Sequence, residues 1–269
     1  MTPRNWEMPS DEEYEALQGL DRNRCPVCGG LGVLLVDTRY MPCPEPDCEA
    51  GQVRRGLLEQ RMKHISNLPK MYVDASLSDF SRLSPDARKG KETAFTLARA
   101  FADHLSIDPS ILGDKWQWND APRNWLVLAG AIGTGKTYLV CSIINHINRH
   151  HGKPALYIRL HDLIQNVLSS YDDDASEDSQ RILWRYEDMP VLMIDEFNLE
   201  KVTEHTRQTM EAILRYRYAQ DKPTLFTLNQ NQQQFQDAWG ERIATVMFDK
   251  AVWCNMRGRS LRNHAGEVG

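Results

Sequence analysis

The sequence predicts an α/β protein, with a parallel sheet flanked by helices, preceded by a small cysteine-rich module. Three observations support this class. From residue 84 onward, apolar segments of strand length alternate with segments of helical periodicity. One strand segment, "WLVLAG", runs into the glycine-rich stretch "AIGTGKT" and then into the helical pattern "YLVCSIINHINRHH". Finally, four of the six cysteines form two close pairs before residue 50.

Composition indicates a soluble globular protein. Hydrophobic residues make up 41% and charged residues 26% of the 269-residue chain. No apolar run approaches the ~18 residues that a membrane helix needs, so no membrane association is expected. The N-terminus is polar and acidic, unlike a signal peptide, so a cytoplasmic location is expected. A net charge of -5 argues against wholesale coating of nucleic acid, but it permits a local basic surface.

The paired cysteines predict a structural zinc site. They follow the pattern Cys-x2-Cys and Cys-x4-Cys, and four thiolates presented by two turns can close a tetrahedral shell. The expected ligands are Cys25, Cys28, Cys43 and Cys48. The zinc either only stabilises a mini-domain or stabilises a module that binds a partner. A third alternative is a redox role for the first cysteine pair. Cys141 and Cys254 lie in apolar patterns and are expected in the core.

The domain organisation follows from composition. Residues 1–66 are expected to form the zinc-binding module, to which the resemblance described below adds partner docking, residues 67–83 a linker, and residues 84–269 the nucleotide-binding domain. Residues 84–105 read as one helix with a serine N-cap. A basic helix is expected directly after the cysteines; its charges form either a solvated face or a contact with nucleic acid or a partner.

The glycine-rich stretch is a phosphate-binding P-loop, because it connects a strand to a helix. Its glycines let backbone N–H groups point inward at phosphate. The Lys136 ammonium is expected to reach the β- and γ-phosphates, and the Thr137 hydroxyl to ligate Mg²⁺. The expected nucleotide-binding residues are Gly130, Gly133, Thr134, Gly135, Lys136, Thr137 and Tyr138.

Two later strands end in polar residues with catalytic chemistry. "PVLMIDEF" ends in Asp195, expected to be a second Mg²⁺ contact, and Glu196, which can orient the attacking water. "KPTLFTLNQ" delivers Asn229, whose amide can hydrogen-bond the γ-phosphate or the water. The strand "ALYIRL" is expected to be inserted between the P-loop strand and the strand of Asp195, which is typical of P-loop ATPases that use a catalytic glutamate.

The C-terminal segment is rich in arginine, the residue that stabilises charge on a transferring phosphoryl group. The candidates are Arg242, Arg257, Arg259 and Arg262. Composition alone does not choose among them.

From about Leu68 to Arg262 the chain resembles the DnaC/DnaI-type helicase loaders and the related IstB-type transposition ATPases, which are AAA+ proteins. The matching stretches include "LPKMYVDASLSDF", "LAGAIGTGKTYLV", "PVLMIDEF", "ILRYRYAQDKPTLFTLNQ" and "MRGRSLR". The resemblance implies an AAA+ P-loop ATPase with a parallel five-stranded sheet, ATP and Mg²⁺ as ligands, and self-association into an oligomer.

The resemblance also assigns roles. Asn229 resembles the first sensor, and Arg262 the second sensor, which contacts nucleotide bound to its own subunit. The family's arginine finger lies four residues after the arginine of "GER", where this chain has Val246. Either Arg242 or another arginine replaces the finger, or hydrolysis between subunits is weak.

For function, the cysteine module favours a loader. The N-terminal zinc module of DnaI-type loaders docks on the hexameric replicative DNA helicase, which is delivered onto single-stranded DNA. IstB-type proteins usually lack such a module, although the spacing also resembles the ribbon of DnaJ-type chaperones. The alternatives are a DNA-binding ATPase that regulates a transposase, and a non-enzymatic adaptor that uses ATP as a clamp.

Overall fold

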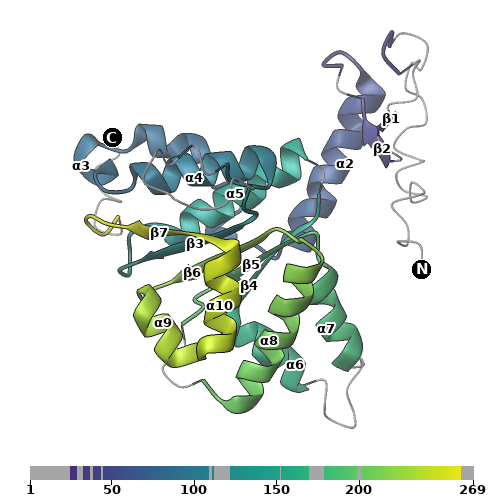
Figure 1. Ribbon diagram of the computed structural model, residues 1–269. Helices are drawn as coiled ribbons and strands as arrows, with labels where there is room; N and C mark the ends of the chain where they lie inside the picture. Colours follow the sequence, from purple (N-terminus) through teal and green to yellow (C-terminus); the bar gives the residue numbers. More distant parts are fainter. Residues whose placement is uncertain are drawn as a thin grey trace. The chain divides into compact units, whose positions relative to one another are not determined.

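The computed structural model describes residues 25–28, 33–36, 39–43, 45–108, 111, 122–151, 153–169, 179–198 and 202–261. The chain divides into two units between His64 and Ile65, close to the expected end of the N-terminal module. Helix α2 (Glu49–Ser66) runs through this division (Figure 1). Each unit is described by itself below.

The first unit contains a short hairpin and most of α2. Strands β1 (Val33–Val36) and β2 (Arg39–Pro42) pair antiparallel, as expected for the strand-like segment between the cysteine pairs. The buried apolar residues that the structure describes in this unit are Cys28, Cys43, Cys48 and Ala50, with Gly51 buried beside them. Because so little apolar burial is found among these described residues, we expect a further source of stability in this unit.

The second unit is built on a five-stranded parallel sheet. Its strands are β3 (Trp125–Gly130), β4 (Ala155–Arg159), β5 (Val191–Asp195), β6 (Thr224–Leu228) and β7 (Ala251–Met256). Their order is β4-β5-β6-β3-β7. The fold class expected from the sequence is therefore confirmed. The prediction of which strand is inserted was wrong. Strand β6, rather than the "ALYIRL" strand β4, lies between the P-loop strand β3 and β5, and β4 forms one edge of the sheet.

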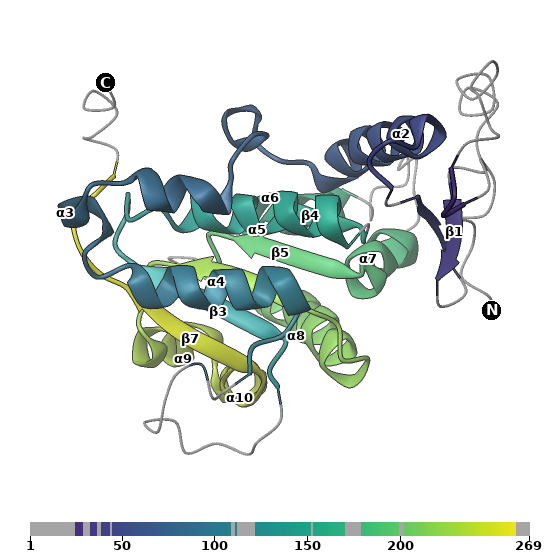
Figure 2. The ribbon, with the colours of Figure 1, turned by 90° about the horizontal axis from the view of Figure 1, so that it is seen from above.

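Helices cover both faces of this sheet, which explains why its strands are apolar throughout. Figures 1 and 2 show α4 and α5 on one side of the sheet and α8, α9 and α10 on the other. The helices are α4 (Glu92–His104), α5 (Lys136–His150), α6 (Leu160–Ser169), α7 (Ser179–Asp188), α8 (Glu204–Ala219), α9 (Gln232–Trp239) and α10 (Glu241–Lys250). Among the described residues, no helix combines the length and apolar character of a membrane span.

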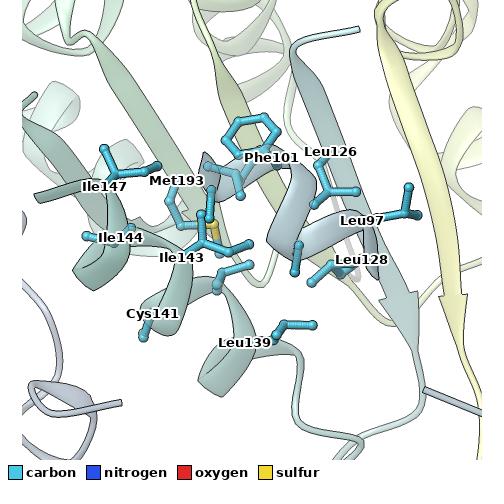
Figure 3. Close-up of a cluster of buried hydrophobic side chains, with 14 of the residues drawn as sticks. Leu97, Phe101, Leu126, Leu128, Leu139, Cys141, Ile143, Ile144, Ile147 and Met193 are labelled. Atoms are coloured by element: carbon cyan, nitrogen blue, oxygen red, sulfur yellow. The ribbon is translucent and has the colours of Figure 1, made fainter. Parts of the chain in front are cut away.

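Alternate residues of each strand enter two separate cores. Leu126 and Leu128 of β3 pack against α4 and α5, while Trp125 and Val127 face the other helices. Figure 3 shows the first core, where Phe101 of α4 and Ile143 of α5 lie with the leucines of β3. Cys141 and Cys254 are both buried in this core, as the sequence predicts. The two cores hold β3 rigidly, and β3 leads directly into the P-loop.

The expected linker, residues 67–83, is part of the second unit rather than a free connection. It forms two short 3₁₀ helices, η1 (Lys70–Tyr72) and η2 (Leu77–Arg82). Ala75 and Leu77 are buried in the core that α4 and α5 share. The Asn145 side chain of α5 donates to the backbone oxygens of Tyr72 and Ala75. These contacts involve small apolar and backbone groups, which a serine- and aspartate-rich composition does not reveal.

The single helix expected over residues 84–105 is broken in two. Helix α3 (Pro85–Arg88) ends before Gly90, and α4 begins at Glu92. Gly90 has a φ of +78°, and its carbonyl accepts a hydrogen bond from the Arg257 amide. A Cβ at Gly90 would lie 3.0 Å from the Arg257 oxygen, so glycine permits this close approach. The break lets the C-terminal segment pack beside the start of α4.

Candidate functional site

The P-loop connects the end of β3 to the first residue of α5, Lys136. Gly133 and Gly135 have φ angles of +84° and +97°, a conformation that residues with a Cβ rarely adopt. Lys136 Nζ donates to the carbonyl oxygens of Gly130 and Ala131, at 2.7 and 2.9 Å. The loop therefore has the strand–glycine–helix geometry that places backbone N–H groups at the N-terminus of a helix, where anions bind.

The C-terminal segment packs directly on this loop. The Leu261 amide donates to the Gly133 carbonyl at 2.8 Å. A Cβ at Gly133 would lie 2.2 Å from Ser260 Oγ, and one at Gly135 would lie 2.9 Å from Leu261 Cδ1. Arg262, the expected second sensor, directly follows this contact but lies outside the described residues. Gly133 and Gly135 thus leave space for the C-terminal segment, in addition to shaping the candidate phosphate site.

The Asp195 carboxylate is buried at the end of β5, with 2% of the residue exposed. Thr137 Oγ1 donates to it, at 3.1 and 3.3 Å from its two oxygens. The Tyr157 hydroxyl donates to Oδ2 at 2.6 Å, and the Thr227 hydroxyl donates to Oδ1. Three neutral hydroxyls therefore stabilise one buried negative charge. The sequence predicts the pairing of Thr137 with Asp195 but not the two other donors.

Glu196 is held in a strained backbone conformation at the edge of the site. Its φ is +54°, in the left-handed region that costs energy for a residue with a Cβ. The Glu196 amide donates to Thr227 Oγ1, and the next amide, of Phe197, donates to the Thr227 oxygen. Because neighbouring strands enforce this turn, the exposed Glu196 side chain projects where β5 ends.

Asn229 directly follows β6, one strand away from β5. The residue is exposed, and its backbone amide donates to Asn198 Oδ1 at 3.2 Å. Asn198 was not singled out in the sequence, because an asparagine three residues after a strand is common in turns. The contact connects the β5 and β6 ends, so that Glu196 and Asn229 line the same cavity.

A cavity of about 630 Å³ joins these groups. It is lined by the expected nucleotide-binding residues from Gly133 to Tyr138, together with Asp195, Glu196 and Asn229. Leu77, Phe80 and Leu83 of the segment expected to be a linker form another part of its wall. The Tyr138 hydroxyl binds the Asp79 carboxylate, and burial, with this hydrogen bond, raises the pKa of Tyr138 to about 12. The cavity is therefore polar around the P-loop, and its wall along η2 combines the apolar Leu77 and Phe80 with the charged Asp79 and Arg82.

The other candidate arginines lie apart from these groups. The Arg242 side chain is 81% exposed at the start of α10, and its nearest acidic partner is Glu211 at 3.9 Å. It is not among the described residues that line the cavity. Arg257 is exposed, and Arg259 Nη1 lies 3.1 Å from the Asp86 carboxylate. The structure thus brings none of these three side chains to the P-loop within one chain.

The oxygen groups at the P-loop fit a magnesium ion, which prefers oxygen ligands. Thr137 supplies a hydroxyl and Asp195 a buried carboxylate that already contact each other. A cation of this charge beside Asp195 would compensate the burial of its carboxylate. The donor set at this end of the cavity is therefore compatible with a magnesium–nucleotide complex.

The four cysteines of the first unit fit a zinc ion. Their sulfur atoms all lie within 4.8 Å of one another. Cys25 and Cys43, and likewise Cys28 and Cys48, are 3.6 Å apart at sulfur. A zinc tetrahedron with bonds of about 2.3 Å requires sulfur separations of about 3.8 Å. Burial raises the pKa of the Cys43 thiol to about 12, so a cation is needed to hold it as a thiolate.

The first turn of α2 closes this sulfur cluster. The Gly51 amide donates to Cys48 Sγ at 3.3 Å. A Cβ at Gly51 would lie 2.9 Å from the Cys43 oxygen and 3.2 Å from Cys48 Sγ. Such amide contacts orient and stabilise thiolate ligands. Gly51 lies in a helical segment, where glycine is normally unfavourable, and that mismatch is the signal that could have identified it.

Comparison with known proteins identifies relatives that share most of this chain. DnaC replicative helicase loaders of Buchnera aphidicola from Schizaphis graminum and from Baizongia pistaciae are 20% and 24% identical. The alignments cover 76% and 74% of this chain and 76% and 90% of those proteins. The DnaC loader of Escherichia coli K12 is 23% identical over 51% of this chain and 56% of its own length.

Solved structures share the fold. The crystal structure of the DnaC helicase loader matches with a TM-score of 0.57 and 19% identity, covering 70% of this chain and all of that one. The structure of DnaI matches with a TM-score of 0.55 and 21% identity, covering 74% and 98%. The replication initiator DnaA, bound to AMPPCP and single-stranded DNA, matches at 0.56 and 16% identity, covering 72% and 52%. The expected fold, a parallel five-stranded sheet flanked by helices, is therefore shared with these proteins.

A family model described as "IstB-like ATP binding protein" matches residues 96–264, which include the P-loop, the buried Asp195 and the segment packed on the loop. Because this match covers more than half of the sequence, the chain belongs to the family of IstB-like ATP-binding proteins.

Proposed function

We propose that this protein is an ATP-dependent helicase loader, which grips a replicative DNA helicase through its cysteine module and delivers it onto single-stranded DNA. The observation that carries the proposal is the similarity to DnaC loaders over about three-quarters of the chain. The chemistry of that site supports ATP turnover as the energy source.

ATP would bind with its phosphates against the P-loop. The backbone amides and the Lys136 ammonium would receive the β- and γ-phosphates. Thr137 and Asp195 would hold magnesium, which supplies positive charge to the phosphate oxygens. Since Asp195, Glu196 and Asn229 come from β5 and β6, on one side of β3, the γ-phosphate would lie toward those strands. The base would then lie against the apolar wall of Leu77, Phe80 and Leu83.

Glu196 would act as the general base of hydrolysis. Its carboxylate would take a proton from a water molecule whose oxygen attacks the γ-phosphorus, and the bond to the β-phosphate oxygen would break to release ADP. Asn229 would orient the same water or the γ-phosphate. Arg262 would complete the site as the second sensor. In this chain Val246 occupies the position of the family's arginine finger. The exposed Arg242 would instead be available to the nucleotide of a neighbouring subunit in a self-assembled oligomer.

The cysteine module would supply the grip on the helicase. Its four sulfurs would close the shell of a zinc ion without leaving an open position, so the metal would be structural rather than catalytic. DNA contact would come from the basic C-terminal segment, where Arg257 is exposed. Phosphate contacts of this kind weaken steeply with salt.

Paired truncations test this division of labour. Removing residues 1–64 should abolish capture of the replicative helicase from the same organism but leave ATP binding nearly intact. Removing residues 1–83 should abolish both, because Leu77 and Phe80 line the nucleotide cavity. Helicase binding at full strength by the shorter truncation would contradict the docking role. ATP binding by the longer one would contradict the assignment of the cavity wall.

The second candidate is a DNA-binding ATPase that regulates a transposase, and the family match favours it. It predicts ATP-dependent filaments on duplex DNA, visible by electron microscopy, and no complex with the helicase. The loader predicts the reverse, together with faster helicase-driven unwinding of a duplex that carries a single-stranded tail when ATP is present.

A further inference from the structure

We propose that Tyr157 is a positioning residue for Asp195, and through it for the magnesium ion of the ATP site. This inference rests on the proposed ATPase function, and it assigns a role to the edge strand β4 that the phosphate-binding motifs do not include.

Tyr157 reaches the Asp195 carboxylate from β4, the strand next to β5. The two strands pair in parallel, with Arg159 opposite Asp195 and Tyr157 opposite Met193. The side chain of Tyr157 therefore spans the distance of two residues along the sheet to bring its hydroxyl 2.6 Å from Asp195 Oδ2. Tyr157 is 5% exposed and is not among the residues lining the cavity, so it acts through Asp195 rather than on the nucleotide.

Each oxygen of Asp195 has its own donor from a flanking strand. Tyr157 of β4 donates to Oδ2, and Thr227 of β6 donates to Oδ1. Thr137 of α5 contacts both oxygens from the side of the cavity. The two strand donors fix the plane of the carboxylate, and Thr137 and Asp195 together would hold the magnesium ion. Donors of this kind, one layer behind a metal ligand, typically change metal affinity by 10- to 100-fold.

Tyr157 is also held from its backbone, because its carbonyl oxygen accepts a hydrogen bond from the Asn67 side chain at 3.3 Å. Asn67 has a φ of +52° and directly follows Ser66, which binds Asn148 of α5 at 2.7 Å. Tyr157 is thus fixed at both ends.

The test is Tyr157→Phe, which keeps the ring and removes the hydroxyl. Tyr186→Phe is the matched control, because Tyr186 is equally buried in α7 and its hydroxyl accepts from Asn166, away from the cavity. Binding of a fluorescent ATP analogue is titrated with Mg²⁺, and binding of the analogue is also measured in EDTA. Bound Mn²⁺ is counted by electron paramagnetic resonance as a direct measure of metal affinity.

We expect Tyr157→Phe to raise the Mg²⁺ and Mn²⁺ concentrations for half-saturation about tenfold, with unchanged analogue affinity in EDTA. The Tyr186→Phe variant should match the wild type. Equal or tighter metal binding by Tyr157→Phe would overturn the inference alone. An equal loss of affinity in EDTA would also overturn it, because it would indicate a general structural role. Wild-type protein that binds no nucleotide would overturn the ATPase function as well.

Discussion

The two units of this molecule both hold polar groups in a fixed geometry, but they differ in how much apolar burial supports those groups. In the ATP-binding unit, two apolar cores pack against the two faces of the sheet, and the candidate catalytic groups lie at strand ends. In the first unit, the described core consists of three cysteines and Ala50. In this unit the candidate metal ligands themselves make up most of the described core.

The difference teaches where each unit's stability originates. The ATP-binding unit buries large side chains such as Trp125 and Phe226, each of which contributes roughly 2–3 kcal/mol. Its fold therefore does not depend on its ligand. The cysteine module has no comparable burial among its described residues, so we expect metal binding and folding to be one process. Changes to the two units should consequently fail in different ways.

The largest expected effect is on the metal site. Cys28→Ser should unfold the module, because structural zinc contributes about 10–16 kcal/mol of apparent binding free energy near neutral pH in small domains. The ATP-binding unit should keep its melting temperature. Metal content by mass spectrometry and two-transition calorimetry would measure both. Val27→Ser is the control, because Val27 is 43% exposed in the same turn and should keep its zinc. A zinc content of zero in the wild type would contradict the comparison.

In the ATP-binding unit the largest effect should be on chemistry rather than folding. Glu196→Gln should reduce phosphate release roughly 10²- to 10⁴-fold while ATP stays bound, because an amide holds water but cannot accept its proton. The rate of phosphate release and the affinity for a fluorescent analogue are the measurements. Release at the wild-type rate would show that another group is the base.

Lys136→Ala should weaken ATP binding roughly 10- to 100-fold, since it removes a charged donor to phosphate whose contribution is about 1.5–3 kcal/mol. The module should remain folded, with its zinc. Arg242→Ala is the control, because its exposed side chain lies outside the cavity and should not alter binding within one chain. Unchanged titration curves for Lys136→Ala would contradict the phosphate assignment.

The same contrast explains what the sequence could predict. The candidate ligands of each motif lie within a few residues of one another in the sequence. The cysteine spacing therefore predicts Cys25 with Cys28 as a pair, and the P-loop pattern predicts Lys136 with Thr137. The fold class was also found, because buried parallel strands read as continuous apolar runs. Strand order was not: a run such as "ALYIRL" has the same pattern whether it lies at the edge or in the middle.

What the sequence could not predict depends on contacts between distant segments. Tyr157 reads as an ordinary core residue, and only the sheet register brings its hydroxyl to Asp195. Residues 67–83 read as a linker, because the groups that dock them are backbone oxygens held by Asn145. The break at Gly90 depends on Arg257, far along the chain. Periodicity carries no information on such pairings.

The smallest effect we predict is the sharpest test of the comparison, because it uses two glycines of one helix. In α2, a Cβ at Gly51 would lie 2.9 Å from the Cys43 oxygen and 3.2 Å from Cys48 Sγ, while a Cβ at Gly56 meets nothing within 4 Å. Alanine favours a helix by about 1 kcal/mol over glycine at either position. Gly56→Ala should therefore stabilise the module slightly and leave zinc affinity unchanged.

Gly51→Ala gains the same helical preference but must displace the backbone that holds two ligands. We expect weaker zinc binding, by roughly tenfold, in competition with a chromophoric chelator. Circular dichroism of the zinc-loaded proteins would show equal or greater helicity for Gly56→Ala. Equal zinc affinity for the two variants would show that the module tolerates movement at its ligands. Its geometry would then be set by the helix rather than by the metal, which would reverse the contrast between the two units.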